Sequence, residues 1–298
     1  MNKITHLYRT KYDGFNLVHF IEKLKENEIE NLPRIPCYST IRNMFLEQKL
    51  IITKRRKGTK LHRMRKSYER EGIMVQIDGS PHRWLQKHSP FCLTAAIDDS
   101  TGKFLAGKFT KTETTFAAMD VVEKIVKKHG RFQMLYSDKA GIYGNNKRDG
   151  YSNMNRAMSD LGILSLQANT PQAKGKVERL FGTLQDRLTS ELRLRDIKTI
   201  EEANRYLDEE FIDYFNSRFA RKAKNEQSAY RPLDSDVNLD DVFTMRDHRI
   251  VKNGQVINYE SHQYVLENGE NLIKKSVEIR HYRNCLLYTS PSPRDQSG

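Results

Sequence analysis

The order of strand-like and helix-like segments between residues 73 and 194 constrains the fold of this 298-residue chain more than any other feature. Three strand-like runs come first, at 73–78, 91–97 and 103–109, and their short connections indicate an antiparallel meander. From residue 114 onward, helical and strand periodicities alternate, so the predicted order is β-β-β-α-β-α-β-α. A mixed sheet with helices on both faces buries these apolar surfaces, which makes the fold class α/β.

The later elements each carry their own periodicity. In chain order we expect a helix at 114–129, a strand at 132–137, a helix at 153–161, a strand at 163–167 and a long helix at 171–194. Thr170 is expected to cap the long helix, with Pro171 in its first position. Another helix is predicted over 199–217, because Thr199 and Glu202 have the spacing of a capping box.

Three acidic residues occupy specific positions in this pattern. Asp78 is predicted to end the first strand and Asp138 the fourth, and ligand sites in open α/β sheets gather at the carboxyl ends of strands. Glu178 lies one residue, or about 100° around the helix, from Val177 in the buried stripe of the long helix. We interpret Asp78, Asp138 and Glu178 as catalytic and metal-ligating residues.

Converging carboxylates repel one another, and divalent cations relieve that repulsion. Mg²⁺ suits a few carboxylates together with water and phosphate oxygens, so we expect two Mg²⁺ ions, with Mn²⁺ as the alternative. No organic cofactor is indicated. Taken singly, an aspartate at a strand end is more often a turn former, and Glu178 could pair with Lys174 on the helix surface. Glu113 is a candidate accessory acid for which an ordinary surface role is preferred.

The net charge of +13, from 51 Lys and Arg against 38 Asp and Glu, favours a polyanionic partner. Nucleic acid is preferred over an anionic membrane because no amphipathic apolar face accompanies the charge. No window reaches 18 apolar residues, and the N-terminus lacks a signal-peptide pattern, so we expect a cytoplasmic protein. Cys37, Cys92 and Cys285 lie far apart, which indicates neither a disulfide framework nor a zinc site.

The N-terminal segment resembles a DNA-binding region. Helical spacing at 15–24, and a second helix for which Ser39 is the expected N-cap, fit a helix-turn-helix, although a purely structural helix pair fits as well. Residues 54–66 contain eight Lys or Arg and no acid, and we expect them to contact phosphates. The candidate DNA-contacting residues are Ser39, Thr40, Arg42, Arg55, Arg56, Lys57, Lys174, Lys176 and Arg179.

Composition divides the chain into five parts. We predict a partial helix-turn-helix region with a basic linker at 1–72, the catalytic core at 73–220, a linker at 221–246, a small β-barrel-like domain at 247–284 and a non-native tail at 285–298. The β-domain rests on the hairpin signals Asn253-Gly254 and Asn268-Gly269. The tail, CLLYTSPSPRDQSG, breaks the strand pattern and looks like translated read-through.

Residues 73–220, about half of the chain, resemble the integrase-type core of insertion-sequence transposases, most closely the ISNCY-like group, and more distantly retroviral integrases. The strings that carry the resemblance are VQIDGSPHRWL, AIDDSTGKF, YSDKAGIY, LGILSLQANTPQAKGKVERLFGTLQDRL and EANRYLDEEFIDYFNSRFA. The resemblance implies an RNase H-like core with an Asp-Asp-Glu triad at Asp78, Asp138 and Glu178. In such a core the first and fourth strands are neighbours, so the two aspartates should lie side by side at one edge of the sheet. The resemblance also implies a double-stranded DNA substrate, a homodimer or higher oligomer, and a bacterial, nucleoid-associated protein that cleaves and joins DNA.

Some features depart from the family pattern. The first part of the usual DNA-binding region is missing, so we expect a fragment. Gln185 stands where some related integrases have a basic residue, and Lys139 directly follows Asp138. Two rival functions are an RNase H-like nuclease or resolvase, and an inactive, truncated transposase-derived DNA-binding protein.

Overall fold

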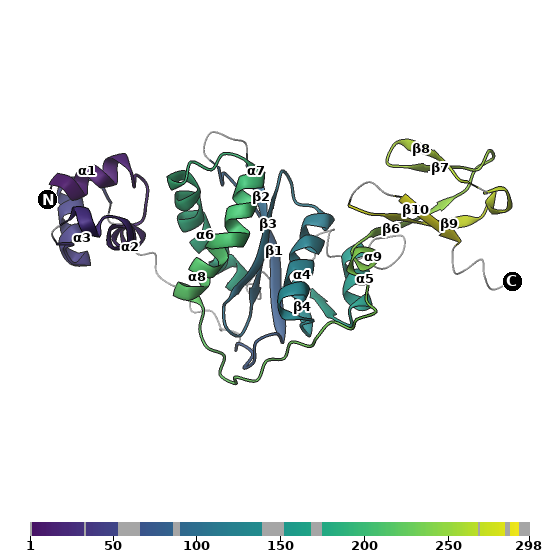
Figure 1. The fold of residues 1–298 in the computed structure, drawn as a ribbon, viewed down its shortest axis with the longest axis horizontal. Helices are drawn as coiled ribbons and strands as arrows, with labels where there is room; N and C mark the ends of the chain where they lie inside the picture. Colours follow the sequence, from purple (N-terminus) through teal and green to yellow (C-terminus); the bar gives the residue numbers. More distant parts are fainter. Residues whose placement is uncertain are drawn as a thin grey trace.

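The computed structural model describes residues 2–32, 34–52, 66–85, 90–138, 152–167, 175–267, 269–283 and 287–291. Figure 1 shows short helices at the N-terminal end, a central sheet flanked by helices, and a group of strands at the C-terminal end. Within the described residues, no helix is both long and apolar enough to cross a membrane. Cys37 and Cys92 are free thiols.

The central sheet has five strands. They are β1 (Met74–His82), β2 (Phe91–Asp98), β3 (Phe104–Thr110), β4 (Met134–Ser137) and β5 (Leu164–Gln167). Their order across the sheet is β3-β2-β1-β4-β5. The first three strands pair antiparallel, whereas β4 runs parallel to both β1 and β5. This is the RNase H-like mixed sheet that the element order predicts, and the adjacency of the first and fourth strands is confirmed.

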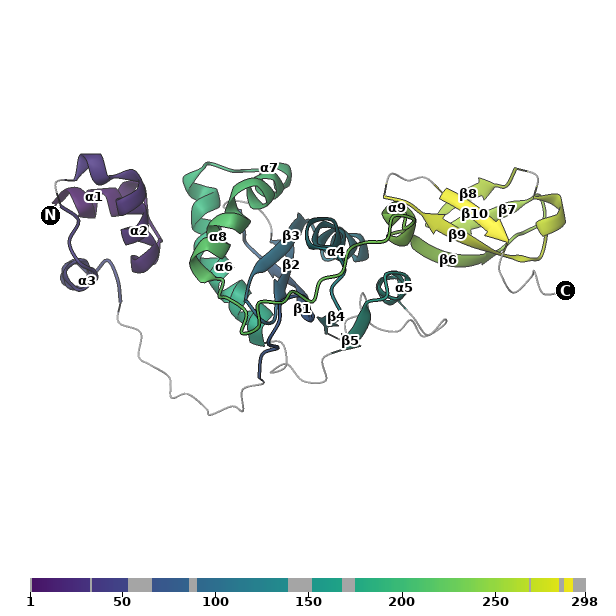
Figure 2. The ribbon, with the colours of Figure 1, turned by 60° about the horizontal axis from the view of Figure 1, so that its bottom comes forward.

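Helices cover both faces of the sheet, as Figure 2 shows. They are α4 (Thr115–His129) and α5 (Asn153–Asp160), then α6 (Gly175–Leu194), α7 (Ile200–Tyr206) and α8 (Ile212–Phe219). One core packs Val75 and Ile77 of β1 against α4 and α5. The other packs Leu93 and Ala95 of β2 against α6, α7 and α8. The two cores fix which side chains of the sheet face α6.

The helix predicted over 199–217 is confirmed with one irregularity. Thr199 and Glu202 form the expected capping box. A π-helical turn, Leu207–Phe211, lies between α7 and α8. Leu207 and Phe211 are both buried in the core beside α6, so the extra residue in this turn keeps the apolar side chains facing the sheet.

Two boundary predictions are wrong. Asp78 does not end its strand: β1 pairs with β2 as far as His82. Among the described residues, the part of β1 beyond Gln76 pairs only with β2, and a strand with one open side tolerates Pro81. Ser39 is not the N-cap of its helix: α3 (Tyr38–Glu47) begins earlier, with Cys37 at the cap and no side-chain capping bond.

The N-terminal helices form a unit with its own core. They are α1 (Asn2–Thr10), α2 (Leu17–Asn27), a 3₁₀ turn (Ile29–Asn31) and α3. Tyr8, Phe20 and Phe45 pack against one another at its centre through edge-to-face and tilted ring contacts. This unit docks on α6, where Arg187 Nη1 lies 2.5 Å from Glu22 Oε2. The first of these helices, α1, was not predicted.

The C-terminal elements are a short helix and a group of strands. They are α9 (Leu239–Val242), β6 (Met245–Ile250), β7 (Val256–Tyr259), β8 (His262–Val265), a 3₁₀ turn (Glu270–Leu272), β9 (Ser276–His281) and β10 (Leu287–Pro291). The strands form a three-stranded sheet, β10-β9-β6, and a two-stranded sheet, β7-β8. Pairing of β10 with β9 uses residues that the sequence interpretation left out of the fold. That residues 285–298 are a non-native tail stays a prediction.

The segment predicted as a linker, 221–246, packs along the central domain. The Ala229 N–H donates to Glu71 O over 2.9 Å, and Arg231 pairs with Arg131. Gly130 permits this approach: its φ is +95°, and a Cβ there would lie 2.4 Å from Arg231 O. The polar composition of the segment gave no sign of this docking.

We therefore expect Gly130→Ala to lower the free energy of unfolding by about 1–3 kcal/mol from backbone strain alone, and by more through the clash with Arg231. Gly162→Ala is the matched control, because Gly162 also has a positive φ (+66°) but has nothing within 4 Å of a Cβ. Gly162→Ala should lower the free energy of unfolding by about 1–2 kcal/mol. Urea unfolding measures both variants, and equal losses would show that the Gly130–Arg231 approach is unimportant.

Candidate active site

Strand register brings the segment that leads to Asp138 beside β1. In the parallel pair of β1 and β4, Gln76 is level with Tyr136. Side chains alternate along strands, so Asp78 shares a face of β1 with Gln76. Gln76 identifies that face, because its Oε1 accepts a hydrogen bond from the backbone N–H of Val177 in α6 over 3.3 Å. Asp78 therefore lies on the α6 side of the sheet, and Asp138 directly follows the end of β4.

Helix α6 crosses this face and carries Glu178. Its first described turn is tied to Gln76, and one more contact lies two turns later, where Gln185 Nε2 donates to Ser80 Oγ over 3.2 Å. Asp78 lies between these two anchor points on β1. The predicted buried stripe is confirmed, since Val177, Leu180, Phe181, Leu184 and Leu188 are all buried. Glu178 is exposed beside that stripe.

The three predicted acids are brought together only in part. The register makes Gln76 level with Tyr136, two positions before Asp78 and Asp138, but among the described residues no three His, Cys, Asp or Glu side chains form a group that could hold a metal ion. The structure therefore does not join Glu178 to the two aspartates in such a group. The chain after Asp138 (139–151) and before α6 (168–174) lies outside the described residues, and so do Lys139, Thr170 and Pro171.

Glu113 lies closer to the site than its sequence position suggested. A Cβ on Gly79 would lie 2.5 Å from Glu113 Oε1, so this carboxylate reaches the backbone next to Asp78. Burial, with the charges of Glu113 and Asp78 nearby, raises the pKa of the Cys92 thiol to about 11. The signal was available in the topology: two antiparallel steps make β3 run the same way as β1, so the residues that follow β3 reach the same edge.

A buried polar network fastens the start of α6 to the sheet. Gln76 Nε2 donates to Asp99 Oδ1 over 2.8 Å, while its Oε1 accepts from Val177. Lys176 Nζ donates to Ser67 Oγ over 2.7 Å and lies 3.6 Å from Asp99 Oδ1. Gln76 and Asp99 are almost fully buried. The residues on the N-terminal side of Glu178 are thus held to β1, two positions before Asp78.

We predict that Gln76→Leu loosens this attachment. The substitution removes a donor from the buried Asp99 carboxylate and an acceptor from the Val177 N–H, which should cost about 1–3 kcal/mol in unfolding free energy. Hydrogen exchange should rise at the α6 amides near Val177 more than at those near Leu188. Equal exchange in both turns would contradict this role for Gln76.

The candidate DNA contacts fall into two groups. Arg55, Arg56, Lys57 and Lys174 lie outside the described residues. Ser39 and Thr40 are exposed in the first turn of α3, Arg42 is half-buried, and Arg179 is exposed beside Glu178. Lys176 has protein partners, as described above. Their contact with DNA stays a prediction.

No protein-family model matches the chain. It is 33% identical over 291 residues to the putative transposase y4bF of Sinorhizobium fredii, a match that spans 94% of this chain and 62% of that protein. It is 36% identical over 221 residues to the transposase for insertion sequence IS1202 of Streptococcus pneumoniae, spanning 72% of this chain and 47% of that protein. The chain is thus similar to transposases over most of its own length. It spans about half to three-fifths of the length of these relatives.

Solved structures that resemble the chain are less similar in sequence than these relatives. The HTLV-2 integrase catalytic core domain in complex with magnesium is 14% identical, with a TM-score of 0.41 over 54% of this chain and 98% of that one. A simian T-cell lymphotropic virus intasome chain is also 14% identical, with a TM-score of 0.43 over 86% of this chain and 89% of that one. At these TM-scores the likeness supports no functional argument.

Proposed function

We propose that this chain is the catalytic part of a DDE-type DNA transposase, a polynucleotidyl transferase that cleaves the ends of a mobile element and joins them to target DNA. The observation that carries the proposal is the parallel register of β1 and β4, which makes Gln76, beneath α6, level with Tyr136; these residues come two positions before Asp78 and Asp138. Similarity to the putative transposase y4bF and to the transposase for insertion sequence IS1202 supports the reaction class.

Asp78, Asp138 and Glu178 would hold two Mg²⁺ or Mn²⁺ ions. Their carboxylate oxygens are the hard donors that these cations prefer, and Asp78 lies on β1 while Asp138 directly follows the adjacent strand β4. When bound, the ions supply activation of the attacking oxygen and stabilisation of the leaving oxygen in an in-line displacement. The attacker is water in cleavage and a DNA 3′-hydroxyl in joining, so the chain itself needs no covalent nucleophile.

Double-stranded DNA is the proposed partner. The net charge of +13 attracts a polyanion, and the exposed first turn of α3, with Ser39 and Thr40, offers polar groups to a major groove. Joining two element ends to one target requires at least two active sites, so we propose a homodimer or higher oligomer on DNA. The protein would act on chromosomal DNA in the bacterial cytoplasm.

A strand-transfer assay with precut element-end duplexes tests the proposal. Mg²⁺- or Mn²⁺-dependent joining to a target duplex is the expected result. Cleavage without joining would instead indicate a nuclease or resolvase. A gel shift without any metal-dependent cleavage would indicate a DNA-binding protein that has lost catalysis.

A further inference from the structure

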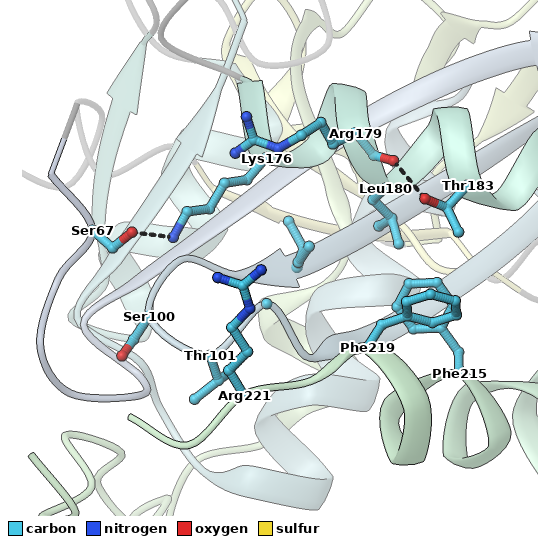
Figure 3. Close-up of a pocket in the computed structure, with 12 residues that line it drawn as sticks. Ser67, Ser100, Thr101, Lys176, Arg179, Leu180, Thr183, Phe215, Phe219 and Arg221 are labelled. Carbon is cyan, nitrogen blue, oxygen red and sulfur yellow. Dashed lines mark hydrogen bonds between the residues drawn. The ribbon is translucent and has the colours of Figure 1, made fainter. Parts of the chain in front are cut away.

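A pocket of about 340 Å³ opens beside the N-terminal half of α6. Its walls come from that helix, from the turn between β2 and β3, and from the chain on either side of the catalytic core. Figure 3 shows polar and cationic side chains along one side of it and aromatic rings of α8 along the other. The polar lining residues are Ser67, Ser100, Thr101, Lys176, Arg179, Thr183 and Arg221.

Two guanidinium groups at this pocket have no acidic partner among the described residues. Neither Arg179 nor Arg221 forms an ion pair with a described residue, whereas Lys176 forms one with the buried Asp99 carboxylate. Arg221 is held in place by its backbone, whose N–H donates to Thr101 O over 2.9 Å. The pocket therefore has a lining residue, Arg221, whose backbone is held by a hydrogen bond, and two guanidinium groups without an acidic partner among the described residues.

Two basic segments of the chain meet at the pocket. Residues 66–70 and 221–226 lie side by side, because the Asn225 N–H donates to Glu69 O over 3.0 Å. Together the two segments contain five basic residues (Lys66, Arg70, Arg221, Lys222 and Lys224) against two acids (Glu69 and Glu226). The first segment continues directly from the basic run at 54–66.

We infer that this pocket binds a backbone phosphate of DNA, with Arg221 and Arg179 as its ligands. Guanidinium groups suit phosphate oxygens because they can donate two parallel hydrogen bonds. Arg179 follows Glu178 directly on α6, so a phosphate held here would lie beside the proposed catalytic site. The inference rests on the proposed function for the identity of its ligand and adds a binding site, centred on Arg221, outside the carboxylate triad.

Binding of a labelled DNA duplex in EDTA, at several salt concentrations, tests the site without catalysis. Arg221→Ala and Arg179→Ala should each lower the slope of log K against log salt by about 0.9, and weaken binding roughly 5- to 10-fold at 0.1 M salt. Arg221→Lys should keep most of the salt slope but bind less tightly. Arg205→Ala is the matched control, because Arg205 is exposed on α7, does not line the pocket and makes the same change in charge.

Wild-type slope in Arg221→Ala, or an equal loss in Arg205→Ala, would overturn the inference. Thermal unfolding of each variant excludes loss of fold as the cause, and Arg221 is exposed, so its removal leaves the core intact. Failure of the proposed function is distinguishable. In that case the wild-type chain shows no metal-dependent cleavage or joining, whatever the slopes of the arginine variants.

Discussion

Replacing Asp78, Asp138 or Glu178 by its amide is expected to lower the rates of cleavage and strand transfer more than 100-fold, with little change in DNA binding. The amide keeps the shape of each side chain but removes the negative charge that holds a divalent cation. Loss of groups that merely support a metal ligand typically costs about 10–100-fold, so loss of a ligand itself should cost more. Initial rates on precut element-end duplexes, in Mg²⁺ and in Mn²⁺, measure the effect.

Glu201→Gln is the control for this series, because Glu201 is an exposed acid in the first turn of α7. Its rates should equal those of the wild type. Glu113→Gln provides a further comparison, since Glu113 lies beside Gly79 and neighbours Asp78. A wild-type rate in any one of the three triad variants would remove that residue from the proposed site.

Glu191→Ala is expected to lower the free energy of unfolding by about 3–5 kcal/mol, because it removes the buried carboxylate that His19, Lys23 and Arg195 share. Glu191 Oε1 lies 2.6 Å from His19 Nε2 and 2.8 Å from Lys23 Nζ, and the carboxylate is fully buried. Both partners lie on α2, so this contact joins the N-terminal helices to α6. Urea unfolding should show the loss.

The same contact makes stability depend on pH. Burial alone would raise the pKa of Glu191, but the hydrogen bonds and charges of His19 and Lys23 outweigh it and lower the pKa to about 2 from its ordinary 4.5. A depressed folded-state pKa stabilises the protein above the unfolded value. This contribution is therefore present above about pH 4.5 and is lost as the pH falls toward 2.

Glu210→Ala is the control for Glu191→Ala, because Glu210 pairs with Arg195 across 3.3 Å but is 61% exposed. Its removal should cost less than about 1 kcal/mol at any pH. Two results would contradict the docking role of Glu191. One is a similar loss of unfolding free energy in the two variants, and the other is a stability of Glu191→Ala that falls at acidic pH as steeply as that of the wild type.

Periodicity was enough to predict the central domain. The alternation of Val75 and Ile77 with Gln76 and Asp78 assigned β1 and its two faces, and both cores follow that division. The stripe that begins at Val177 likewise placed Glu178 at the edge of a buried helix face. These signals are local, and they act over one element at a time.

Contacts between distant segments could not be predicted in this way. The Gln76–Asp99–Lys176 network joins residues from three elements, and nothing local marks Gln76 as buried. The tight turn between β7 and β8 uses Glu260 and Ser261 at φ values of +46° and +65°, without the glycine that signals such turns. Asp78 and Asp138 could be assigned to neighbouring strands because the RNase H-like fold implied by the resemblance makes the first and fourth strands neighbours. Whether Glu178 reaches the two aspartates depends on side-chain packing, which the fold alone does not give.

The most direct measurement is a crystal structure of the chain bound to Mn²⁺ and an element-end duplex, with anomalous density locating the ions. The proposed site requires Mn²⁺ coordinated by carboxylate oxygens of Asp78, Asp138 and Glu178 at about 2.0–2.2 Å, as expected for a small octahedral cation. If Mn²⁺ binds elsewhere, or if Glu178 points away from both aspartates in the DNA-bound state, the assignment of these three residues as one catalytic site is wrong.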